Sequence, residues 1–157
     1  MLFRSQAYVK ISRPDLATIT VPETITLAAA RPGIFTTNQQ GQGAILNVQG
    51  RLVDSTAPAT RGDVVAVYCT GLGATQPAVV SGRPAPGVEP LARVTIVPQA
   101  TVGGIPAVVQ FAGLSPGFVG LYQVNVQIPA GVTPGAAVPV VLLQNGVPSN
   151  TVSLALR

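Results

Sequence analysis

The chain has 157 residues, of which 47% are hydrophobic and only 9% are charged, with a formal net charge of +4 and no histidine. This length fits one domain of ordinary size with an added segment, and the charged fraction is well below the roughly 25% of typical soluble proteins. The nine basic residues are scattered and no apolar run reaches membrane-spanning length, so composition indicates neither a nucleic-acid-binding stripe nor a membrane span.

The residue pattern favours an all-β fold. Val, Ile and Thr dominate between 17 Gly and 15 Pro, and these turn residues interrupt every window with helical apolar spacing. The predicted strands, in chain order, are residues 7–12, 18–21, 24–29, 43–47, 63–70, 94–97, 107–112, 121–128, 138–143 and 151–156. Many short strands with frequent turns predict a sandwich or a barrel.

The first strands resemble the last ones. Residues 8–21 and 140–156 both contain an alternating strand, a polar turn and a returning strand, and Val9 and Ile11 match Val141 and Leu143. We therefore interpret residues 1–30 as a hairpin segment like the last hairpin of a domain whose front half is absent. A lone two-stranded hairpin is marginal in water. It either packs on its own sheet or completes a sheet in another copy.

Turn signals divide the middle of the chain. Pro32-Gly33, Gly103-Gly104 and Asn145-Gly146 predict tight turns, and the last pair predicts a hairpin because both residues accept positive φ. The proline-rich residues 79–90 predict a surface loop, since proline cannot donate to a strand ladder.

Residues 120–129 carry the clearest strand signal, because odd and even positions differ in kind. One side has Tyr122, Val124, Val126 and Ile128. The other side has Leu121, Gln123, Asn125 and Gln127. We expect the apolar side to face a core. We also expect Tyr68 and Tyr122 to be buried, with their hydroxyls at the sheet rim.

Several motifs in a fixed order resemble a known family. They are Pro32-Gly-Ile-Phe-Thr36, Gly41-Gln-Gly-Ala-Ile-Leu-Asn47, Gly62-Asp-Val-Val-Ala-Val-Tyr-Cys-Thr-Gly-Leu-Gly73, Phe111-Ala-Gly-Leu, Gly120-Leu-Tyr-Gln-Val-Asn125, and Val138-Pro-Val-Val with Ser149-Asn-Thr-Val152. Over roughly residues 31–157 the chain resembles the uncharacterised C-terminal domain of large secreted proteins of Solibacter and related acidobacteria. The resemblance implies an immunoglobulin-like β-sandwich and an extracellular or cell-surface setting. It implies no activity and no catalytic residues.

Together these patterns predict an all-β, immunoglobulin-like Greek-key sandwich over residues 31–157, preceded by an N-terminal β segment over residues 1–30 that is a candidate donor strand.

The residue types argue against an enzyme. Without histidine there is no serine triad, and the five acids are widely separated, with no calcium-loop pattern. They are Asp15, Glu23, Asp54, Asp63 and Glu89. The glycines at 71 and 73 are not followed by the lysine and helix start that a phosphate loop requires. Cys69 lies in an apolar run and is interpreted as a buried structural thiol. We expect no cofactor and no metal.

The sole lysine, Lys10, is a candidate for a covalent cross-link to an asparagine, as in some surface β-domains. The alternative is a solvated lysine between Val9 and Ile11. An intact mass lower by one ammonia would distinguish the two.

The predicted function is structural. The low charge favours a surface partly covered by other copies, and we expect an extracellular or cell-surface subunit that assembles with itself, as in a pilus-like filament, by strand complementation. The predicted interface side chains are Tyr8, Val9, Ile11, Leu16, Ile19 and Val21. The alternative is a non-catalytic adhesion or accessory module with a surface glycan or protein as its ligand.

Overall fold

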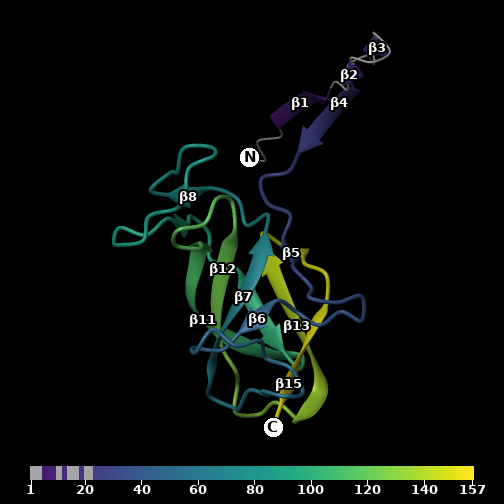
Figure 1. The fold of residues 1–157 in the computed structure, drawn as a ribbon, viewed down its shortest axis with the longest axis vertical. Coiled ribbons are helices and arrows are strands. Elements are labelled where there is room, and N and C mark those ends of the chain that lie inside the picture. The colour runs from purple at the N-terminus through teal and green to yellow at the C-terminus, as the bar shows by residue number, and fades with distance from the viewer. Residues whose placement is uncertain (1–4, 10–11, 14–17, 20–22) are drawn as a thin grey trace.

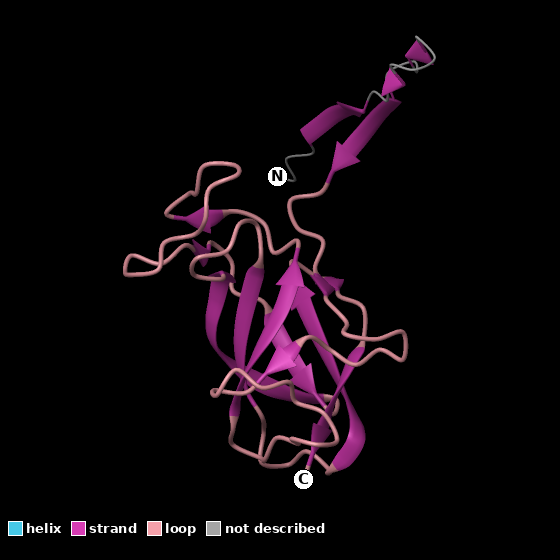
Figure 2. Ribbon diagram, viewed as in Figure 1, coloured by secondary structure: helices cyan, strands magenta, loops and turns pink. Residues whose placement is uncertain are grey.

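The computed structural model describes residues 5–9, 12–13, 18–19 and 23–157. These residues form strands and loops without any helix (Figure 2), which confirms the all-β prediction. Accordingly, the described part of the chain has no helix of the length and apolar character needed to cross a membrane.

The strands form two structural parts (Figure 1). The N-terminal ribbon consists of β1 Ser5–Val9, β2 Ser12–Arg13, β3 Thr18–Ile19 and β4 Glu23–Leu27. The body, residues 30–157, consists of β5 Gly33–Ile34, β6 Ile45–Leu46, β7 Val64–Thr70, β8 Thr75–Gln76, β9 Arg93–Val94, β10 Gln99–Val102, β11 Ile105–Leu114, β12 Tyr122–Gln127, β13 Gly135–Gln144, β14 Val147–Pro148 and β15 Val152–Leu156.

A single antiparallel sheet curls around the core of the body. Its main path runs β14-β13-β10-β11-β12-β7-β5, while β15 pairs β13 and β6 pairs β7. The long strand β11 joins the two halves, because it pairs β10 near its start and β12 farther along. The order β13-β10-β11-β12 places the fourth strand beside the first, which is the Greek-key order for these four strands. An immunoglobulin-like order for the whole body stays a prediction, as does the domain boundary at residue 30.

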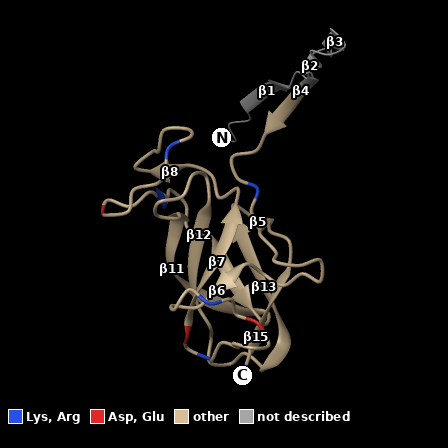
Figure 3. Ribbon diagram, viewed as in Figure 1, with Lys and Arg blue, Asp and Glu red and all other residues tan. Residues whose placement is uncertain are grey.

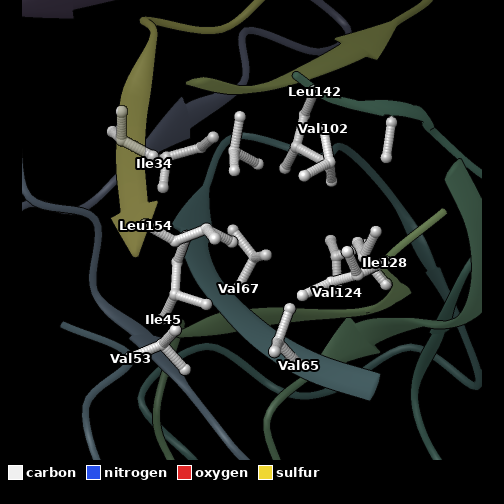
Figure 4. Close-up of a cluster of buried hydrophobic side chains, with 14 of the residues drawn as sticks. Ile34, Ile45, Val53, Val65, Val67, Val102, Val124, Ile128, Leu142 and Leu154 are labelled. Carbon is white, nitrogen blue, oxygen red and sulfur yellow. The ribbon is translucent and has the colours of Figure 1, made fainter. Parts of the chain in front are cut away.

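The core is aliphatic and continuous. It forms because side chains alternate between the two faces of a strand, and the inward positions of β7 and β12 are apolar while the outward ones are mixed. Val124, Val126 and Ile128 are buried as predicted, and Tyr122 is half-buried with its hydroxyl donating to the Gly73 carbonyl oxygen. Figure 4 shows the side chains of this cluster pointing toward one another from several strands.

Two amide side chains close the seam between the first and last strands of the body. The Asn150 side chain accepts from the Ile34 N–H at 2.7 Å and donates to the Ile34 carbonyl oxygen at 3.0 Å. Gln42 Nε2 donates to the carbonyl oxygens of Val53 at 2.9 Å and Ser153 at 3.3 Å. These side chains replace backbone pairing where the chain is too irregular for a ladder.

Two of the turn predictions are confirmed and one is wrong. Asn145 and Gly146 both have positive φ, at 50° and 76°, and connect β13 to β14, and the glycine pair at 103–104 connects β10 to β11. The predicted turn at Pro32-Gly33 is instead the start of β5, because Gly33 pairs with β7. The proline-rich residues 79–90 form a loop, as predicted.

The prediction that Tyr68 and Tyr122 are buried is also wrong, because both side chains are only partly buried. In β7 the buried positions are Val65, Val67 and Cys69, so Tyr68 lies on the outer face and is only partly buried. The period of two determines this orientation and overrides the preference of an aromatic residue for the interior.

Charged residues of the body lie mainly in its loops (Figure 3). Within residues 30–157, Arg93 is the one charged residue that belongs to a strand. It forms an ion pair with Glu89 at 2.9 Å and stacks over the Phe111 ring at 5.1 Å from its centroid. The other strands of the body therefore contain no charged residue.

Candidate interaction sites

The described strands of the ribbon pair only with one another. β1 pairs β4 from Ser5↔Leu27 to Val9↔Glu23, and β2 pairs β3. In Figure 1 β1 and β4 lie beyond one end of the body rather than against its sheet. The outer edges of β1 and β4 have no strand partner among the described residues.

The ribbon has the same register pattern as the C-terminal hairpin. From Val9↔Glu23 to Ser12↔Ile19, the outgoing strand advances three residues and the returning strand four. The rungs of β13 with β15 and β14 show the same three-to-four step between Val140↔Val152 and Leu143↔Pro148. The two hairpins therefore share a step in register, but the pairing makes Val9 equivalent to Val140, one residue away from the Val141 of the sequence match.

This match assigns structural equivalents to the exposed side chains of β4. Counting from Glu23 and Val152, Ile25 corresponds to Leu154 and Leu27 to Leu156. Leu154 and Leu156 are 0% and 4% exposed in the core, whereas Ile25 and Leu27 are 38% and 45% exposed. The ribbon thus exposes side chains of the kind that a completed sandwich buries, at the cost of leaving apolar area in water.

The predicted interface residues are placed in part. Tyr8 and Val9 belong to β1, and Ile19 belongs to β3. The remaining ones, and the candidate cross-linking lysine, lie outside the described residues: Ile11, Leu16, Val21 and Lys10. Ile25 and Leu27, which sequence reasoning left out of the interface, are the large apolar side chains of β4 that the structure shows exposed.

The body has a gap in its strand pairing at β11. On one side, β11 pairs β10 up to Ala107 and β9 at Gly113. Residues 108–112 between these rungs have no strand partner on that side among the described residues. The chain opposite bends at Thr95 and Ile96 instead of continuing the ladder. An interrupted edge of this kind is a template for an added strand.

An apolar groove of about 530 Å³ lies beside this gap. No charged residue lines it, and Ile96, Val97 and Val108 are exposed around it. The apolar part of its lining is Val97, Pro98, Ala100, Pro106, Ala107 and Val109. Sequence reasoning missed this groove because it missed β10, a strand of four residues between proline and glycine.

Two carboxylates of the body, Asp54 and Asp63, accept hydrogen bonds from backbone groups in turns. Asp54 Oδ1 accepts from the Thr56 hydroxyl at 2.7 Å and from the Thr56 N–H at 2.8 Å, which lowers the pKa of Asp54. Asp63 Oδ2 accepts from the Thr60 N–H at 2.8 Å. Within the described residues, no group of three or more acids and cysteines is arranged to hold a metal ion.

In comparisons with known proteins, no family model, no curated protein and no solved structure matches the chain. The resemblance to the acidobacterial domain therefore stays a prediction.

Proposed function

We propose that the protein is a non-catalytic structural subunit that joins other copies of itself by strand complementation, with the ribbon of one copy adding to the body of the next. The observation that carries this proposal is the ribbon, which is built like the last hairpin of the body yet exposes Ile25 and Leu27. The family resemblance supports an extracellular or cell-surface setting for such a subunit.

The ribbon has a physical reason to bind. A two-stranded ribbon is marginally stable by itself, and a third strand or a covering sheet is needed to stabilise it. Adding it to another sheet would satisfy the unpaired N–H and C=O groups of β4 and bury its alternate apolar side chains, the two contributions that drive strand addition.

The acceptor in our proposal is the gap at β11 of a second copy. β4 would pair with residues 108–112, and Ile25 and Leu27 would enter the groove lined by Val97 and Val109. The groove can accept apolar side chains because its lining is uncharged. Ile25 and Leu27 can enter it together because they lie two residues apart, on one face of β4. The contact is between different surfaces of two copies, so repetition produces an open filament rather than a closed dimer.

Filament formation is tested with the full chain and two matched variants. Concentration-dependent polymers should form, as measured by sedimentation and negative-stain electron microscopy. Ile25→Asp should abolish them because it places a charge in the apolar groove. Thr24→Asp, which places the same charge on the opposite face of β4, should leave polymers intact. Polymers unchanged by Ile25→Asp, or a wild-type chain that stays monomeric at about 1 mM, the range of weak contacts, would refute the proposal.

Cross-linking tests the acceptor. Thr26→Cys and Gln110→Cys chains, mixed in equal amounts and treated with a short bismaleimide, should give mainly the mixed dimer. Cys69 does not interfere because it is buried. A product dominated by Thr26→Cys homodimers would show that ribbons pair with ribbons and would overturn the assignment of β11.

A further inference from the structure

A second groove, independent of the ribbon, lies on the outer face of the body. It measures about 330 Å³ and runs over β7 and β12 beneath the turn that follows β6. The volume is at the lower end of the roughly 300–1,000 Å³ that small-molecule sites occupy. The residues that matter for its chemistry are Asn47, Val48, Val64, Tyr68, Gln123 and Asn125.

Hydrogen bonds fix the amide groups of β12. The Ser115 hydroxyl donates to Gln123 Oε1 at 3.0 Å, and Gln123 Nε2 donates to Asn125 Oδ1 at 2.8 Å. The second of these hydrogen bonds occupies Asn125 Oδ1. The Asn125 Nδ2 donors have no partner among the described residues. The groove thus holds an oriented amide donor.

Asn47 presents its amide in the same way from the other wall. Its Oδ1 accepts from the N–H groups of Gln49 and Arg51, both at 3.0 Å, and its Nδ2 has no partner among the described residues. The Tyr68 hydroxyl likewise has no partner there. The groove therefore combines several hydrogen-bond donors with the Tyr68 ring and the apolar side chains of Val48 and Val64.

We propose that this groove binds a neutral saccharide of one or two rings. A sugar supplies hydroxyl oxygens as acceptors for the amide donors, and its C–H face packs on an aromatic ring such as Tyr68. No charged residue lines the groove, which disfavours acidic ligands.

A peptide suits this groove less well. β7 and β12 pair with each other across it, at Tyr68↔Gln123 and Ala66↔Asn125. The groove therefore lies over a face of the sheet and offers no free strand edge to which an extended peptide could add.

The test is titration of the isotopically labelled full chain with cellobiose, maltose and lactose, followed by amide chemical-shift changes. At least one disaccharide should shift resonances of Tyr68, Gln123 and Asn125 and saturate in the millimolar range that about 4 kcal/mol of binding energy supports. If no sugar produces saturable shifts, or the shifts map elsewhere, the proposal is refuted.

Two variants identify the groups responsible. Asn125→Asp keeps an oxygen for Gln123 but replaces the free donor with an acceptor, so affinity should fall about tenfold or more, equal to 1.4 kcal/mol. Gln39→Glu, which adds the same charge in an exposed turn outside both grooves, should not change the affinity. Tyr68→Ala should also weaken binding, with an unchanged spectrum elsewhere confirming the fold. Equal affinity in Asn125→Asp and wild type, or preference for a tetrapeptide over all three sugars, would overturn the proposal.

Discussion

Gly71 occupies a position that no other residue can adopt without moving the backbone. Its φ is +75°, and a Cβ placed there would lie 1.9 Å from the carbonyl oxygen of Arg31. That carbonyl belongs to the segment that enters β5, and the Arg31 N–H donates to the Gly71 carbonyl oxygen at 2.8 Å. The close approach of these two backbones sets where β5 joins the sheet.

We therefore expect Gly71→Ala to lower the free energy of unfolding by about 3 kcal/mol or more, because steric clash and backbone strain are among the few causes of such large effects. Gly50 is the matched control, since its φ is +74° but nothing lies within 4 Å of its Cβ position. Gly50→Ala should cost only the about 1–2 kcal/mol of the left-handed conformation. Urea denaturation of both variants measures the difference, and equal costs would contradict the steric argument.

The Cys69 thiol makes stability depend on pH. Burial raises its pKa from 9.0 to about 12. Above pH 9 the unfolded chain releases this proton while the folded chain keeps it, so the unfolded state binds fewer protons and the free energy of unfolding falls as pH rises. Between pH 9 and 11 the loss should approach about 1.4 kcal/mol per pH unit.

Cys69→Ala should remove this dependence in denaturation experiments at pH 8, 9, 10 and 11. The pKa of Tyr122 is also raised, first by burial and then by Cys69, but Tyr122 is present in both chains and largely cancels in the comparison. The same slope in the two proteins would show that another group controls the alkaline range.

At the scale of elements, β5 is held by a side chain on one of its edges. It has only two residues and pairs with β7 on one side, while the Asn150 amide makes both hydrogen bonds to Ile34 on the other. A two-residue strand has too few backbone bonds of its own to hold the seam. Asn150 therefore contributes what a neighbouring strand would otherwise supply.

Asn150→Ala should lower the free energy of unfolding by about 1–3 kcal/mol, because it leaves the Ile34 N–H and C=O without protein partners. Thr151→Ala is the control, since Thr151 is exposed and its side chain makes no hydrogen bond to the described residues; its effect should stay within about 0.5 kcal/mol. Thermal unfolding with hydrogen exchange at Ile34 measures both effects. Unchanged protection of the Ile34 amide in Asn150→Ala would contradict this role.

The long strand β12 could be predicted from the sequence, whereas the two-residue strands β5 and β8 could not. The alternation at Val124 and Val126 identified β12 because six residues display a period of two. Strands of two residues, such as β5 and β8, contain no period to detect. Likewise, nothing in the sequence around Asn150 indicates its hydrogen-bond partner, because Ile34 lies 116 residues away in the chain.

At the scale of the whole molecule, the sequence predicted an all-β body with a separate N-terminal hairpin, because turn residues and the internal repeat are both local signals. It did not predict the curled path of the sheet or the two grooves. Those depend on which strands become neighbours, and β11 in particular joins two halves of the sheet that its sequence alone does not distinguish.

The ribbon and the β11 gap give the proposed assembly a direction. Each copy donates one ribbon and receives one, so in any string of copies the first has an unused gap and the last has an unused ribbon. The two tips therefore differ in chemistry and should grow at different rates. A cell-surface protein that carried either a ribbon or a β11 gap could therefore anchor one end of the filament.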